Sequence, residues 1–282
     1  GFVSFTDMAT PYADHLFVRL LGARRLTIDE KWNSRDVRST FWRLYFNRSR
    51  EPVAGCASLL LKDREYVVSP GTVHLVPAWI TFSCRCLGEV DHFYIHFDIV
   101  GIPGPLCRRL FPAPFAIAGD DVSAAIAVRS NEIGPSGLDR VAEAARVKAA
   151  LHTAIAEALD RVPGGSQELL QGIPATLGCL QATLQWIEDH LSDRISNDVL
   201  AERCGWSTDH FVRRFREAVG QTPARHVTER RVAVAAERLL FTDSSIDEIA
   251  ESVGLPNRHY LSRVFSQKMG LPPAAYRRTA HV

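Results

Sequence analysis

Short apolar segments separated by turns fill about the first 120 residues of the chain. In the clearest of them, VDHFYIHFDI at 90–99, side chains alternate between two faces, as in a β-strand. One face carries Phe93, Ile95 and Phe97, and the other carries His92, Tyr94 and His96. Ser69-Pro70-Gly71 is typical of a hairpin turn. Short strands at regular spacing predict a barrel or a sandwich.

From Gly137 the apolar residues follow helical spacing. The segment 138–162 predicts one helix, and its apolar stripe holds Val141, Leu151, Ile155, Leu159 and Val162. Pro163-Gly164-Gly165-Ser166 ends this helix and marks a domain boundary. The remainder is predicted to consist of short helices separated by Gly and Pro.

The C-terminal part contains an internal repeat. At an offset of 49 residues, Ala201 matches Ala250 and Gly205 matches Gly254. At an offset of 50, the matches are His210 with Tyr260, Arg213 with Arg263, Phe215 with Phe265, Gly220 with Gly270, and Pro223 with Pro273. The second half has one more residue than the first, and this residue falls in the turn that follows Gly254.

Each half predicts a short helix, a Gly in the left-handed conformation, a turn capped by Ser207 or Asn257, and a second helix. This order is that of a helix-turn-helix, here present twice. Residues about four apart share one side of a helix, so the outward faces of the two second helices are candidates to enter a DNA major groove. Those faces hold Asp209, Val212, Arg213 and Arg216 in the first half, and Arg258, His259, Ser262 and Arg263 in the second. A charged face on a single helix is more often simply solvated, but its repetition at matching positions favours DNA binding.

The segment from Pro223 to Phe241 predicts a rigid helix between the two halves. Its 19 residues would span roughly 28 Å, close to the roughly 34 Å between successive major grooves on one side of DNA. Ser245 and Glu248 have the spacing of a capping box, which predicts where the second half begins.

Composition agrees with a globular protein of two domains. The chain has 282 residues, 46% of them hydrophobic, and 33 basic against 32 acidic side chains, so any basic surface must be local. No apolar run approaches the roughly 20 residues of a membrane span, no signal segment is evident, and six scattered cysteines predict reduced thiols. We therefore expect a cytoplasmic protein.

Residues 195–278 resemble the DNA-binding domain of the AraC/XylS family of transcription regulators, most clearly in SIDEIAESVGLPNRHYLSRVFSQKMGLPPAAYRR. The resemblance implies a seven-helix domain whose first helix begins near Cys179, and DNA contacts by Arg213 and Arg263. The chain departs from the family pattern at Leu255, Pro272 and Arg214.

Members of this family often carry an N-terminal cupin-like barrel that binds a small effector, and residues 50–100 resemble its central strands. The resemblance implies an α+β chain of three parts. Residues 1–136 form a cupin-like barrel, and residues 137–175 form a connecting and dimerisation helix with a linker. Residues 176–282 form an all-α domain in which a linker helix joins two helix-turn-helix motifs. In the family a helix in this position forms the dimer contact, so the resemblance implies a homodimer in which the stripe at 151, 155, 159 and 162 forms an antiparallel pair. The alternative is that this stripe packs on the barrel.

The candidate effector-binding residues are Trp79, His92, Tyr94 and His96. Three alternatives to effector binding stay open. In the first, His92 and His96 lie on a solvated strand face or form hydrogen bonds in the core. In the second, a metal is held by three histidines and possibly two cysteines, namely His74, His92, His96, Cys84 and Cys86. In the third, the barrel is an enzyme. The spacing of these metal ligands fits no familiar closed site, and no catalytic motif is evident, so neither an enzyme nor a cofactor is expected.

The predicted function is an effector-responsive, sequence-specific DNA-binding regulator of transcription. The predicted partners are double-stranded DNA, a small-molecule effector, a second copy of the chain and RNA polymerase, and no membrane is expected. Activation and repression both stay open.

Overall fold

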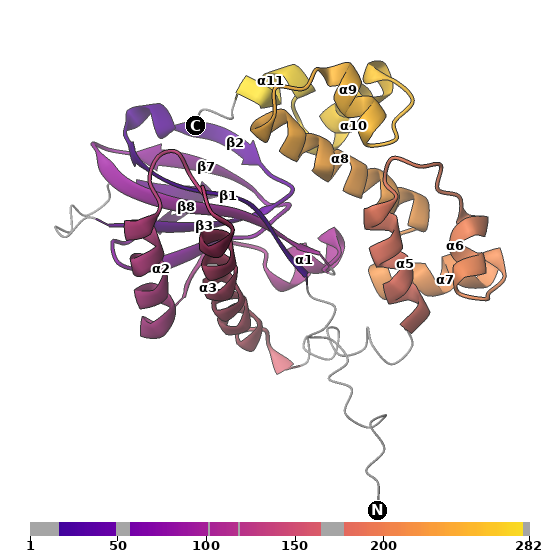
Figure 1. The fold of residues 1–282 in the computed structure, drawn as a ribbon, viewed down its shortest axis with the longest axis horizontal. Coiled ribbons are helices and arrows are strands. Elements are labelled where there is room, and N and C mark those ends of the chain that lie inside the picture. Colours follow the sequence, from indigo (N-terminus) through magenta and orange to yellow (C-terminus); the bar gives the residue numbers. More distant parts are fainter. Residues whose placement is uncertain (1–16, 49–56, 101, 118, 165–177, 279–282) are drawn as a thin grey trace, which may run out of the picture.

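The computed structural model describes residues 17–48, 57–100, 102–117, 119–164 and 178–278 (Figure 1). Its N-terminal part contains two antiparallel sheets. The five-stranded sheet has the order β1 (Phe17–Ile28), β8 (Val90–Val100), β3 (Trp42–Asn47), β6 (Val73–Val76) and β9 (Phe115–Ile117). The four-stranded sheet has the order β2 (Ser34–Arg38), β7 (Thr81–Cys86), β4 (Ala57–Leu61) and β5 (Arg64–Val67). A 3-10 turn, Glu30–Trp32, connects β1 to β2.

The two sheets face each other across one apolar core. Tyr45 and Val90 from the first sheet pack in the same cluster as Leu59 and Phe82 from the second. The other side of the five-stranded sheet is covered by α2 (Asp120–Glu132) and α3 (Val141–Asp160), which both lie on that side in Figure 1. The short helix α1 (Gly104–Leu110) follows β8. The predicted strand-rich N-terminal unit is confirmed.

Strand β8 has the predicted alternation, but both of its faces are covered. Phe93, Ile95 and Phe97 are completely buried in the core under α2 and α3. His92 is 1% exposed and faces the space between the sheets, which rules out a solvated strand face for this histidine.

Two local expectations for this part were wrong, and one helix was not predicted. Ser69-Pro70-Gly71 does not close a hairpin, because β5 and β6 lie in different sheets and the turn carries the chain from one to the other. Helix α2 was not expected, since its segment lacks a clear apolar stripe. Val141 lies at the start of α3 with 89% of its surface exposed, outside the buried stripe.

The remainder of that stripe packs on the barrel. Leu151, Ile155 and Val162 lie in the same core as Phe93, so they are not available to a partner chain. The expectation that these side chains form a dimer contact is therefore corrected, because burial within the protomer already uses them.

Residues 178–278 form seven helices, as the family resemblance implied. They are α5 (Gly178–Asp189), α6 (Asn197–Arg203), α7 (Thr208–Val219), α8 (Pro223–Phe241), α9 (Ile246–Ser252), α10 (Arg258–Met269) and α11 (Pro273–Arg277). Helix α8 spans the residues predicted for the linker helix, and the capping box of Ser245 and Glu248 is formed at the start of α9.

Helix α8 contributes to three cores. Val227 packs with α5, α6 and α7, Leu239 packs with α9, α10 and α11, and Ala233 packs in the core that also holds Phe93 and residues of α2 and α3. Figure 1 shows the two groups of short helices at opposite ends of α8. Among the described residues no helix is both long and apolar enough to cross a lipid bilayer.

Candidate nucleic-acid interface and barrel cavity

The two predicted recognition helices, α7 and α10, are built alike. The side chain of Ser207 accepts a hydrogen bond from the backbone N of His210, and that of Asn257 accepts one from Tyr260. Each helix has 12 residues and ends at a glycine in the left-handed conformation, with φ of 76° at Gly220 and 77° at Gly270. Caps at both ends fix where each helix begins and ends.

Two phenylalanines determine which side of each helix faces outward. Phe215 on α7 and Phe265 on α10 are both 0% exposed and lie in separate cores. The opposite sides hold the eight predicted DNA-binding residues. Asp209, Arg213, Arg216, Arg258, His259 and Arg263 are exposed, and Val212 and Ser262 are partly buried.

On α7 the predicted residues gather along one groove. Asp209, Val212, Arg213 and Arg216 line it together with residues that the sequence did not indicate, namely Asn197, Thr208, Glu217 and Thr222. The hydroxyl of Thr208 donates to Asp198 at 2.7 Å, which ties the start of α7 to α6.

The matched arginines are held by matched neighbours. Arg213 Nη2 lies 3.1 Å from His210 Nδ1, and the guanidinium of Arg263 lies over the ring of Tyr260, 4.9 Å from its centroid. Each contact joins positions i and i+3 on one helix face, so each guanidinium is supported by the ring side chain one turn before it, through a hydrogen bond on α7 and a cation–π contact on α10. On α10, Arg258 also forms an ion pair with Asp247 at 3.5 Å.

A cavity of about 260 Å³ lies between the two sheets of the barrel. It is lined by Arg24, Leu26, Ile28, Trp32, Ser34, Val37, Arg43, Tyr45, Cys84, His92, Tyr94, His96, Leu240 and Phe241. Three of the four candidate effector-binding residues are therefore together here. Trp79 is not: it is 6% exposed and packs in the core under α2 and α3.

The inward residues of β3 and β8 face each other in three rows. Arg43 is paired with His96, Tyr45 with Tyr94, and Asn47 with His92. The sequence analysis missed Arg43, although a charged residue in the apolar segment WRLYFN, where every residue is buried, was an available signal.

Both imidazoles of the cavity are neutral at pH 7. Burial lowers the pKa of His92 to about 3 and that of His96 well below its usual value, and the charge of Arg43 contributes at His96. Burial also raises the pKa of Cys84 to about 12, so this thiol stays protonated.

Helix α8 closes one end of the cavity through Leu240 and Phe241. The ring of Phe241 lies 6.0 Å from that of His96 and 6.1 Å from that of Phe41, centroid to centroid. Gly22 on β1 lies beside this ring, and a Cβ there would meet it at an ordinary contact distance of 4.0 Å. The C-terminal end of the linker helix is therefore part of the wall.

Buried ion pairs hold α8 against the barrel. Arg230 on α8 donates from Nη2 to Asp98 of β8 at 2.7 Å and from Nε to Glu188 of α5 at 2.6 Å. Arg19 of β1 lies 2.5 Å from Glu237 of α8 and 3.3 Å from Asp98. These contacts join four elements, β1, β8, α5 and α8, that are far apart in the sequence.

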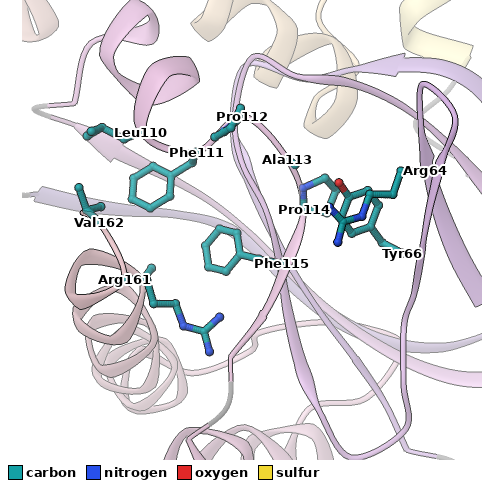
Figure 2. A pocket seen from close by; sticks show the side chains of 11 residues that line it. Arg64, Tyr66, Leu110, Phe111, Pro112, Ala113, Pro114, Phe115, Arg161 and Val162 are labelled. Atoms are coloured by element: carbon teal, nitrogen blue, oxygen red, sulfur yellow. The ribbon is translucent and has the colours of Figure 1, made fainter. Parts of the chain in front are cut away.

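A second cavity, of about 340 Å³, lies where α3 meets the segment between α1 and β9 (Figure 2). Its arginines already have partners within the protein. Arg161 donates to the backbone oxygen of Ala116 and lies near the ring of Phe115, and Arg64 lies over the ring of Tyr66. The barrel cavity, with buried polar atoms that lack partners, is the better candidate for a ligand site.

The candidate metal ligands form no metal site among the described residues, although Cys84, His92 and His96 line the same cavity. His74 Nε2 accepts a hydrogen bond from the backbone N of Ser69 at 3.0 Å, and Cys84 and Cys86 are buried in the core between the sheets. Over the described ranges, no group of three or more His, Cys, Asp or Glu side chains could hold a metal ion.

Two helix-turn-helix units on one helix, with basic outward faces, define a DNA-binding regulator. A family model described as a helix-turn-helix domain matches residues 200–279. The regulatory protein SoxS of Escherichia coli K12 is 32% identical over 98 residues, which are 35% of this chain and 92% of SoxS. The chain belongs to the AraC/XylS family of transcription regulators. This is a family of regulators and not of enzymes, as expected.

Other known proteins are similar to part or to most of the chain. The MmsAB operon regulatory protein of Pseudomonas aeruginosa is 36% identical over 92 residues, and the match spans 33% of this chain and 30% of that protein. The crystal structure of ToxT from Vibrio cholerae O395 covers 94% of this chain and 98% of its own, with a TM-score of 0.52 and 12% identity. This similarity supports the fold of the whole chain, with an N-terminal strand-rich unit before the helical domain.

Proposed function

We propose that the protein is a one-component regulator that places α7 and α10 in adjacent major grooves of double-stranded DNA and binds a small-molecule effector in the barrel cavity. The domains proposed are the barrel at 1–136, the connecting helix and linker at 137–175, and the DNA-binding domain at 176–282. One observation supports the combination: α8 carries both recognition units and ends, at Phe241, in the wall of the cavity.

The contacts to DNA would be made by the eight outward residues of α7 and α10. Arginine suits bidentate contacts to guanine and phosphate, and Arg213 and Arg263 occupy equivalent, supported positions. Asp209 and Val212 are weak readers of base edges, so α7 would mainly position the protein on phosphates while α10 contributes more sequence choice.

An effector would act by changing which arrangement of α8 is preferred. A ligand beside Phe241 touches the helix that orients both recognition units, and so can have different affinities for two arrangements of barrel and α8. We also propose a cytoplasmic location, contact with RNA polymerase, and a homodimer formed through a surface other than the buried stripe of α3.

The DNA part is tested by selecting bound sequences from a random DNA pool with the full chain, Arg213→Ala and Arg263→Ala. We expect a motif of two blocks about one helical turn apart. Arg263→Ala should relax one block at a cost of about 1–3 kcal/mol, and Arg213→Ala should weaken binding or relax the other block. Arg146→Ala, which removes an exposed arginine of α3, serves as the control. If both variants weaken the same block, or leave both blocks unchanged, the two-groove arrangement is wrong.

A further inference from the structure

The barrel cavity contains a buried positive charge without a counter-ion. Arg43 is 9% exposed, and its guanidinium lies between the rings of Phe41 and Phe82, 5.1 and 5.3 Å from their centroids. Its Nη1 atom is buried and has no hydrogen-bond partner. Within the part of the chain that the structure describes, no carboxylate forms an ion pair with Arg43, and no residue that lines the cavity is acidic.

A buried charge is costly unless an opposite charge accompanies it. Elsewhere in this protein that rule is followed: Arg230, which is equally buried, has both Asp98 and Glu188. Because every other side chain that lines the cavity is apolar, neutral or, like Arg24, positively charged, the lining supplies no counter-ion for Arg43, and a negative charge would come from a molecule that enters the cavity. Arg24 at the same cavity adds a second positive charge.

His92 determines which kind of ligand group can bind at the other end of the cavity. The amide Nδ2 of Asn47 donates to the backbone oxygen of Val68 at 2.8 Å, so its Oδ1 faces His92 Nδ1 at 2.7 Å. An oxygen there can only accept, and Nδ1 must therefore carry the proton of this neutral imidazole. His92 Nε2 is left as a buried acceptor without a partner.

The two ends lie along one strand. His92 and His96, which is paired with Arg43, are four residues apart on β8, or about 13 Å at a strand rise of about 3.3 Å per residue. Tyr45 and Tyr94 lie between them. A volume of 260 Å³ equals that of about nine water molecules, which suits a ligand on the order of ten non-hydrogen atoms.

We propose that the effector is a small organic carboxylate with a flat apolar body and a hydroxyl or N–H group at its far end. Its carboxylate pairs with Arg43, its body lies between Tyr45 and Tyr94, and its donor group reaches His92 Nε2. This inference rests on the proposed effector function and adds the chemical class of the effector.

The test uses the full chain and three probes in titration calorimetry: para-hydroxyphenylpropionate, its neutral amide, and phenylpropionate, which lacks the hydroxyl. The acid should bind at least about thirtyfold more tightly than the amide, since an ionic hydrogen-bonded pair is lost, and severalfold more tightly than phenylpropionate. Arg43→Met should remove the preference for the acid. Arg64→Met, which removes an arginine lying over Tyr66 at the second cavity, should leave it unchanged.

Thermal unfolding without ligand gives a second, independent measurement. Arg43→Met should raise the melting temperature by a few degrees, because it removes an unpaired buried charge and keeps an apolar stem against Phe41 and Phe82. Equal binding of acid and amide, no binding of either at millimolar concentration, or a lower melting temperature for Arg43→Met would each overturn the proposal.

The same samples separate this proposal from the proposed function. Acid binding that leaves affinity for the selected DNA unchanged would contradict effector control and leave the carboxylate site intact. A neutral compound that binds the cavity and changes DNA affinity would contradict the carboxylate site and leave effector control intact.

Discussion

Glu237 gives the sharpest test of how the barrel is joined to α8. Its cluster holds three carboxylates, those of Asp98, Glu188 and Glu237, but only the guanidiniums of Arg19 and Arg230 among the described residues. The Glu237 side chain is 13% exposed. Burial raises its pKa from 4.5 to about 7; Arg19 opposes this rise and Asp98 adds to it.

The sign of the pH effect follows from that direction. A carboxyl whose pKa is higher in the folded protein stabilises it fully below about pH 4.5, and this contribution is lost as the pH rises through 7. At about 1.4 kcal/mol per pKa unit, the loss amounts to about 3 kcal/mol above pH 7. In a chain of this size, that corresponds to about 6 °C in melting temperature.

Glu237→Gln keeps the shape of the side chain and removes its charge. Thermal unfolding of the full chain should therefore give equal melting temperatures for the two proteins at about pH 4, and a value about 6 °C higher for the variant at pH 8. Glu217→Gln, which changes an exposed carboxylate in a surface pair with Arg214, should show no such divergence. Parallel pH curves would refute the reasoning, and a less stable variant at pH 8 would show that the pair with Arg19 outweighs burial.

Two further outcomes follow from the geometry. Gly254→Ala should lower the free energy of unfolding in urea by at least about 2–3 kcal/mol, because φ is +68° and a Cβ would lie 2.4 Å from the backbone oxygen of Leu191. Gly205→Ala, with φ of +64° and open space around it, should lower it by only about 1 kcal/mol. Equal losses of stability in the two variants would contradict this explanation. Phe241→Ala should lower the stability of the protein little, because the residue is 41% exposed. It should reduce an effector-induced change in DNA affinity, measured by fluorescence anisotropy, to less than about twofold. An undiminished change would exclude Phe241 from the coupling between cavity and DNA.

The helical domain was predictable because its limits are set by local chemistry. Pro223 begins α8, Ser245 and Glu248 cap α9, and left-handed glycines end α7 and α10, each within a few residues of the group it satisfies. Leu255, a departure from the family pattern, is 5% exposed and fills the core after Gly254.

The barrel was less predictable because its connections depend on distant partners. The turn at Ser69-Pro70-Gly71 has the same local chemistry whether it closes a hairpin or crosses between sheets, and only pairing with β3 and β4 decides. The cavity wall joins Arg43 to Phe241, almost two hundred residues later, and no periodicity in either segment relates them.

The continuous α8 has a consequence for how this chain can vary in length. Each residue of a helix adds a rotation of about 100°, so one residue inserted within α8 would turn the second recognition unit away from the DNA side of the first and move Phe241 off the cavity. The one-residue difference between the two halves lies instead in the turn between Gly254 and Asn257, where added length leaves every helix in phase. Variation in length is therefore compatible with this architecture in its turns and not in its central helix.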